Sequence, residues 1–216
     1  MVIAIDGPAG AGKGTITSKV AEKLGLVNID TGAMYRCLTL EVLRNNISKD
    51  DEDKIVELAS KIKIEFDENK NVFLNNEDVT EKIRSIEVSS LVSEISSIVK
   101  VREIMVEAQR KLAEGLNVIM EGRDITTVVF PNADYKFYLD ASVEERARRR
   151  LIQNKEKGIE STYEEIKDNI EKRDYNDMHK EVGALKRTDD QIYIDSTNMT
   201  IDEVVDFIIS KVGEVK

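Results

Sequence analysis

A short glycine-rich stretch near the N-terminus carries the clearest chemistry in the sequence. It is Gly7-Pro8-Ala9-Gly10-Ala11-Gly12-Lys13-Gly14-Thr15, and an apolar run over 2–5 leads into it. Glycines let consecutive backbone N–H groups turn toward phosphate oxygens, and the N-terminus of a following helix adds partial positive charge. Lys13 adds a full charge. Strand, loop, lysine and helix in this order predict a phosphate-binding P-loop rather than a glycine-rich turn before an ordinary helix.

A second polar group, Glu121-Gly122-Arg123-Asp124, ends a later core strand that we expect over 117–120. A carboxylate at such a strand end can hold magnesium-bound water, and Thr15 offers a hydroxyl to the same ion, directly or through water. Two plainer interpretations stay open. Glu121 could be a solvated strand end, and Thr15 could be a capping residue in the first turn of its helix.

The elements that position these residues alternate between strands and helices. We expect strands over 2–5, 26–29, 117–120, 135–139 and 191–194, and helices over 16–24, from Met34 onward, over 51–60 and, broken once, over 87–113. Ser142 with Glu145, Thr162 with Glu165 and Thr200 with Glu203 are capping-box pairs that predict three more helix starts. The alternation predicts an α/β fold with a five-stranded parallel sheet flanked by helices, and ligands at the carboxyl ends of the strands.

One segment between the helices changes its hydrophobic period. Ile62, Ile64 and Phe66 alternate with polar residues, a turn is expected over 68–71, and Val72 and Leu74 alternate again. This pattern predicts a β-hairpin inserted into the α/β fold.

Composition limits the classes of protein and of partner. The chain has 216 residues, 41% of them hydrophobic, a net charge of −10 and a single cysteine, Cys37. Such a chain is about one globular domain and is not expected to bind nucleic acid or anionic membranes, so an anionic ligand must be held by a local cationic cluster. A lone cysteine and the absence of a long apolar run favour the cytoplasm.

Several segments together resemble one kinase family. In chain order they are GPAGAGKGT, DTGAMYR, EDVTEKIRS, VREIMVEAQR, EGRDITTVVFP, DASVEERARRR and IDST. The GKGT variant resembles the nucleoside monophosphate kinases, and the whole set resembles the bacterial cytidylate kinases over nearly the entire chain. The resemblance implies one P-loop kinase domain over 1–216, with a hairpin-containing substrate arm at about 62–100 and a helical lid at about 155–187. It also implies transfer of the γ-phosphoryl group of ATP to CMP or dCMP with Mg²⁺.

The resemblance also implies roles for single residues. It makes Lys13, Arg123 and Arg173 catalytic, and it places Arg36, Arg123 and Arg173 on the acceptor phosphate. Ser93, Arg102 and Asp124 would recognise cytosine, because Asp124 can accept from its exocyclic amine but would face a carbonyl of uracil. Further substrate-side contacts would come from Thr31, Tyr35 and Asp177, and ATP contacts from Arg146 and Arg150. Three plainer interpretations remain open. Tyr35 could be a core residue, Ser93 could be an ordinary helix residue, and the arginine-rich helix could present a solvated face.

The sequence departs from the expected family pattern at a few positions. Glu121 stands where aspartate is usual, and Thr126 stands where glycine is expected, which costs the loop flexibility. The lid positions Asn176, Met178 and Lys180 are poor in arginine. Other interpretations are a UMP-preferring or other small-metabolite kinase, or an ATP-binding regulator without catalysis. We expect a monomer that has no nucleic-acid or membrane partner.

Overall fold

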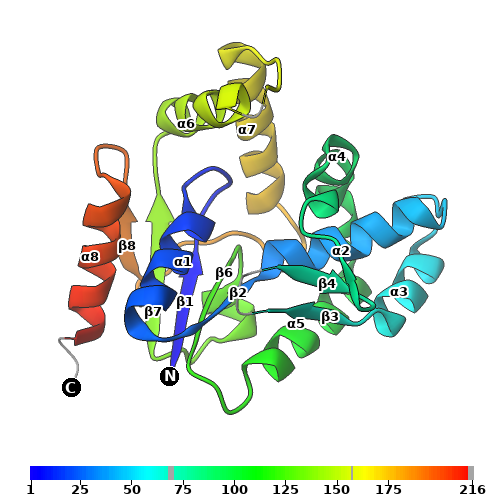
Figure 1. The fold of residues 1–216 in the computed structure, drawn as a ribbon, viewed down its shortest axis with the longest axis horizontal. Helices are drawn as coiled ribbons and strands as arrows, with labels where there is room; N and C mark the ends of the chain where they lie inside the picture. Colours follow the sequence, from blue (N-terminus) through cyan, green and yellow to red (C-terminus); the bar gives the residue numbers. More distant parts are fainter. Residues whose placement is uncertain (68–70, 157, 214–216) are drawn as a thin grey trace. The chain divides into compact units, whose positions relative to one another are not determined.

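Five strands form the central sheet, in the order β2-β6-β1-β7-β8 (Figure 1). They are β1 (Val2–Asp6), β2 (Val27–Asp30), β6 (Val118–Gly122), β7 (Tyr135–Asp140) and β8 (Ile192–Asp195). β1 lies between β6 and β7 and is parallel to both, and β7 is parallel to β8. The predicted α/β fold with a five-stranded parallel sheet is therefore confirmed.

This computed structural model describes residues 1–67, 71–156 and 158–213, which fall into two units. Unit 1 combines Met1–Asn28 with Leu116–Lys216, and unit 2 is Ile29–Gly115. The helices of unit 1 are α1 (Lys13–Leu24), α6 (Val143–Glu156), α7 (Tyr163–Met178) and α8 (Ile201–Gly213), with a π-helical turn, η2 (Ile125–Val129). Among the described residues, no helix is long and apolar enough to cross a membrane.

The core of unit 1 lies between the sheet and helices α1 and α8. Ile16 and Val20 of α1 and Ile208 of α8 pack against Ile5 and Phe137 of the sheet, and these side chains are almost fully buried. Central parallel strands are covered on both faces, which is why β1 is an unbroken apolar run rather than an alternating one.

The three predicted capping boxes differ in how they close. Thr162 and Glu165 form the complete reciprocal pair, and so do Thr200 and Glu203. Ser142 is different. Its hydroxyl accepts from the N–H of Glu145 at 3.2 Å, but its own N–H donates to the hydroxyl of Thr197 at 2.9 Å. The Glu145 carboxylate is consequently left to pair with two arginines of α6, Arg148 and Arg149.

Unit 2 contains helices and a small antiparallel sheet. In chain order its elements are α2 (Thr31–Arg44), α3 (Glu52–Lys61), β3 (Ile64–Phe66), β4 (Val72–Leu74), β5 (Glu77–Asp78), η1 (Lys82–Arg84), α4 (Ile86–Ile95) and α5 (Val99–Ala113). The predicted hairpin is β3 paired with β4, and its turn at 68–70 lies outside the described residues. β5 adds a strand of two residues, which is too short for an alternating pattern. The expected break in the helical stretch falls at 96–98.

Candidate active site

The predicted P-loop joins β1 to α1, and its glycines stand where the backbone requires them. Gly10 and Gly12 have φ angles of +80° and +91°, in the left-handed region that other residues rarely adopt. At Gly7 the reason is space, because a Cβ there would lie 2.0 Å from the carbonyl oxygen of Leu139. The loop is therefore fitted closely against β7.

The ammonium group of Lys13 lies inside this loop. It donates to the carbonyl oxygens of Gly7 at 2.8 Å and Pro8 at 3.0 Å, and the residue is only 5% exposed. Burial, reinforced by the charges of Arg123 and Arg173, lowers the pKa of Lys13 to about 7. A phosphate group in the loop would add negative charge beside this buried ammonium.

The structure explains why a glycine, Gly14, separates Lys13 from Thr15. A Cβ at Gly14 would lie 3.1 Å from Oε1 of Glu121, so glycine leaves room for this carboxylate beside the start of α1. Glu121 Oε2 lies 3.8 Å from the Lys13 ammonium. Within the described parts of the chain, no group of three or more acidic, histidine or cysteine side chains could hold a metal ion. A magnesium ion here would need phosphate oxygens among its ligands, which is how Mg²⁺ is commonly bound.

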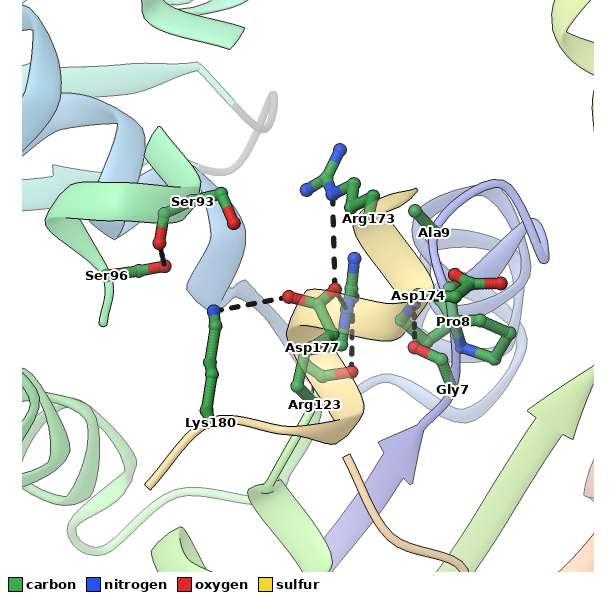
Figure 2. A network of polar contacts seen from close by, with 12 residues as sticks. Gly7, Pro8, Ala9, Ser93, Ser96, Arg123, Arg173, Asp174, Asp177 and Lys180 are labelled. Atoms are coloured by element: carbon green, nitrogen blue, oxygen red, sulfur yellow. Dashed lines mark hydrogen bonds and ion pairs between the residues drawn. The ribbon is translucent and has the colours of Figure 1, made fainter. Parts of the chain in front are cut away.

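A buried carboxylate, Asp177, gathers further positive charge in unit 1 (Figure 2). Its Oδ2 accepts from Nε of Arg123 at 2.7 Å and lies 4.0 Å from Nε of Arg173, and its Oδ1 lies 3.2 Å from Nζ of Lys180. Burial opposes its ionisation, but the charges of Arg123 and Lys180 prevail and lower the pKa of Asp177 to about 2.

Together, four cations and two carboxylates form what we call the cationic cluster: Lys13, Arg123, Arg173 and Lys180 with Glu121 and Asp177. Positive charge exceeds negative charge in this cluster, although the chain as a whole carries a net charge of −10. Local concentration of like charge is costly unless an anion balances it, and guanidinium groups match phosphate oxygens in geometry. The cluster is therefore suited to bind phosphate.

Asp177→Asn is expected to lower the free energy of unfolding by about 2 kcal/mol at pH 7, the linkage value of a shift from 3.8 to about 2. A lowered folded-state pKa stabilises the fold above the unfolded value and loses that contribution as the pH falls through the folded value. The difference between the two proteins should therefore shrink steadily between pH 5 and about pH 2.5. Urea titrations across this range provide the measurement. A difference that is constant with pH would show that Asp177 does not hold this charge.

One residue of the arginine-rich helix α6 contacts the P-loop. Arg146 is 3% exposed and donates to the carbonyl oxygens of Ala141 at 2.9 Å and Ala9 at 3.0 Å, and it pairs with Asp174 of α7 at 2.6 Å. Arg150 is exposed and donates to Gln153 at 2.8 Å on the same helix. Of the two predicted ATP contacts, the structure brings only Arg146 into contact with the P-loop. Both ATP roles stay predictions.

In unit 2, two of the predicted substrate residues, Tyr35 and Arg102, are in contact, and Ser93 is connected to them through Ser96. Arg102 is 4% exposed, donates to the Ser96 carbonyl oxygen at 2.9 Å, and holds its guanidinium carbon 5.5 Å from the centre of the Tyr35 ring. The Ser96 hydroxyl donates in turn to the carbonyl oxygen of Ser93 at 3.1 Å (Figure 2). Arg102 thus links Tyr35 of α2 to the α4–α5 break, and Ser93 takes part only through its backbone carbonyl oxygen.

The other predicted substrate residues have separate settings. Arg36 of α2 donates to the Ser89 hydroxyl at 2.9 Å and to the Ile83 carbonyl oxygen at 3.3 Å. Thr31 is the buried first residue of α2. Asp124 belongs to unit 1, is 4% exposed and directly precedes η2. Their roles toward a substrate stay predictions.

Sequence reasoning gave no site role to Lys180 or Asp174. Lys180 follows Asp177 by three residues, just beyond the end of α7, and this short separation in sequence was the available signal. Asp174 offered none, because its partner Arg146 is distant in sequence.

The chain is similar to known proteins along almost its whole length. The family described as Cytidylate kinase matches residues 3–214. The cytidylate kinase of Caldanaerobacter subterraneus subsp. tengcongensis is 54% identical over 204 residues, which are 94% of this chain and 91% of that protein. The cytidylate kinase of Fusobacterium nucleatum is 45% identical over 216 residues, covering 100% of this chain and 99% of that protein.

Solved structures agree on the fold. The shikimate kinase of Bacteroides thetaiotaomicron superposes with a TM-score of 0.50 at 13% identity, over 99% of this chain and 98% of that one. At so low an identity the similarity concerns the fold alone. The relatives found by sequence have far higher identity. The matched region includes the P-loop, the segment from Glu121 to Asp124 and the helix that carries Asp177. On these matches the chain belongs to the cytidylate kinase family.

Proposed function

We propose that this chain transfers the γ-phosphoryl group of ATP to CMP or dCMP, giving ADP and CDP or dCDP, in pyrimidine nucleotide metabolism. The cationic cluster carries this proposal, because its positive charges include groups beyond the P-loop lysine. A regulator that only binds ATP needs no second phosphate site, whereas transfer to a nucleoside monophosphate does. The family membership supports the same choice.

Phosphoryl transfer depends on positioning and charge more than on covalent chemistry by the protein. The backbone N–H groups of the P-loop and the Lys13 ammonium would hold the β- and γ-phosphates. Arg123 and Arg173 would bind the acceptor phosphate and the migrating group, where guanidinium charge counts most in the transition state. Asp177 keeps Arg123 oriented through its 2.7 Å hydrogen bond. Arg146 would support the loop through Ala9, and Arg150 is the second predicted ATP contact.

The site also has groups that fit a magnesium ion. Thr15 and Glu121 would hold it, since Gly14 leaves space for the carboxylate beside the start of α1. Bound Mg²⁺ neutralises phosphate charge and orients the phosphoryl group. The longer side chain of glutamate suits contact through a water molecule.

We propose the following contacts to the acceptor nucleotide. Arg102 and Ser93 can donate to the O2 and N3 acceptors of cytosine, and Asp124 can accept from its amine. Tyr35 would line the nucleoside, Arg36 would bind its phosphate, and Thr31 and Asp177 would make further polar contacts. A uracil carbonyl facing Asp124 would leave two acceptors opposed, at a cost of about 1–3 kcal/mol per unpaired group.

Asp124→Asn is expected to weaken the use of CMP and to narrow its advantage over UMP. The amide keeps an acceptor and adds donors that tolerate a carbonyl partner. The measurement is kcat/KM for CMP and for UMP in the wild type and the variant. An unchanged ratio would mean that Asp124 does not recognise the amine.

A coupled ADP-release assay with CMP, dCMP, UMP and AMP tests the proposed function. The expected result is rapid release with CMP or dCMP and much slower release with UMP and AMP. Preference for UMP would support the alternative pyrimidine kinase, and release that no acceptor stimulates would support the regulator.

We further propose that the protein works in the cytoplasm as a monomer, with nucleotides as its partners and neither nucleic acid nor membrane. The single cysteine, Cys37, which is buried and free, supports the reducing compartment.

A further inference from the structure

A buried carboxylate at the root of the P-loop has no part in the mechanism above. Asp6 is the last residue of β1, directly before Gly7, and it is fully buried. Its Oδ1 accepts from the N–H of Ile125 at 2.8 Å, and its Oδ2 accepts from the N–H of Thr126 at 2.9 Å and from the Thr126 hydroxyl. Three donors thus converge on one carboxylate, which is what a buried carboxylate requires.

The direction of the hydrogen bond from the Thr126 hydroxyl is determined by Gln191. The side-chain oxygen of Gln191 accepts from the N–H of Thr188 at 2.7 Å, which identifies the other end of the amide as its NH₂ group. That group donates to the Thr126 hydroxyl, so the hydroxyl must use its own hydrogen toward Asp6. Thr126 and Gln191 are 2% and 7% exposed.

This chain of hydrogen bonds joins three functional segments of unit 1. Asp6 begins the P-loop, Thr126 lies in η2 directly after Arg123 and Asp124, and Gln191 holds the backbone of the segment that returns from α7 to β8. Fully satisfied buried polar networks fix a single arrangement of the backbone that carries them. The network is therefore placed to set the position of Arg123 and Asp124 against the P-loop.

We infer that the Thr126 hydroxyl is a positioning group for acceptor binding, because it links Asp6 to Gln191 behind the backbone that presents Arg123 and Asp124. The glycine expected here from the family resemblance would keep the backbone N–H that donates to Asp6, but it has no hydroxyl to donate to Asp6 or to accept from Gln191. The threonine thus replaces a flexible position with a hydrogen-bonded one. This inference rests on the proposed acceptor role of Arg123 and Asp124.

Thr126→Val tests it, with Thr126→Ser as the matched control that keeps the hydroxyl. With ATP saturating, we expect Thr126→Val to lower kcat/KM for CMP by about 10- to 100-fold, since small misplacements of positioned groups reach this size. The CMP-to-UMP preference should fall, while KM for ATP stays within about threefold because the P-loop keeps its own contacts. Thr126→Ser should stay within a few-fold of the wild type on every parameter.

Two further variants separate positioning from general loss of structure. Gln191→Leu removes the group that donates to the Thr126 hydroxyl. The double variant, Thr126→Val with Gln191→Leu, should lose little more kcat/KM for CMP than the more impaired single variant, as expected for one shared network. Thr126→Gly provides a second protein without the hydroxyl, with the same expected loss if Thr126→Val folds poorly. Thermal unfolding of each variant is recorded in parallel.

Three results would each overturn the inference. They are unchanged CMP kinetics in Thr126→Val, an equal loss of kcat/KM for ATP and for CMP in that variant, and a Thr126→Ser variant as impaired as Thr126→Val. A wild-type protein that uses no CMP would instead refute the proposed function, so the two failures are distinguishable.

Discussion

Lys13→Ala is expected to reduce CMP phosphorylation by on the order of 10³-fold or more while the protein still folds. Cationic groups on a transferring phosphoryl have effects of about this size. The ammonium lies within the loop that would hold the phosphates, where two carbonyl oxygens and Glu121 hold it in place. Burial lowers the pKa of Lys13, so the fold disfavours its charge and should not lose stability when that charge is removed.

The matched control for this variant is Lys19→Ala on the same helix. Lys19 is 45% exposed and pairs with Asp202 on the protein surface, so its loss should leave turnover unchanged. Steady-state kinetics and thermal unfolding of both variants decide the matter. Wild-type turnover in Lys13→Ala, at an unchanged Tm, would contradict the P-loop assignment.

Arg173→Ala is expected to lower kcat by about 10²–10³-fold, the usual loss for one donor that acts on transition-state charge. The neighbouring residues Asn176 and Met178 carry no charge, and Lys180 pairs with Asp177 at 3.2 Å. Arg173 lies farther from that carboxylate, at 4.0 Å, and is 37% exposed, so its guanidinium can turn toward a bound phosphate. KM for ATP should change much less, because the P-loop still holds the nucleotide.

Arg148→Ala is the control for the loss of an arginine in the same unit. Its side chain is 65% exposed and pairs with Glu145 on its own helix, so kcat should remain that of the wild type. A kcat for Arg173→Ala within a few-fold of the wild type would mean that another group supplies this catalytic charge.

Much of the fold could be predicted because local signals agreed with the final arrangement. The apolar runs became the five strands, and the pairs Thr162 with Glu165 and Thr200 with Glu203 begin α7 and α8. The signal was incomplete where tertiary contacts compete with local ones. Ser142 gives its N–H to Thr197, so that capping box is only half formed. The π-helical turn η2 has no propensity signature, because its position depends on the distant Asp6.

The parts of the candidate site that lie in one continuous motif could be predicted. Contacts between residues that are distant in the sequence could not. The P-loop glycines follow from phosphate chemistry, whereas the reason for Gly14 appears only when Glu121 lies beside it. Arg146 was expected as an ATP contact, and its buried links to Ala9 and Asp174 depend on how α6 packs against α7. The position of Thr126 suggested only lost flexibility. Its bonds to Asp6 and Gln191 required the fold.

The most direct test of the central claim follows the γ-phosphoryl group itself. The protein is incubated with CMP and ATP labelled with ³²P at the γ-position, and the products are separated by anion exchange. Transfer through the cationic cluster predicts that the label appears in CDP in step with ADP, and that Lys13→Ala and Arg173→Ala abolish or strongly slow its appearance. Label released as inorganic phosphate at a rate independent of CMP, or no loss of label from ATP at all, would contradict the account.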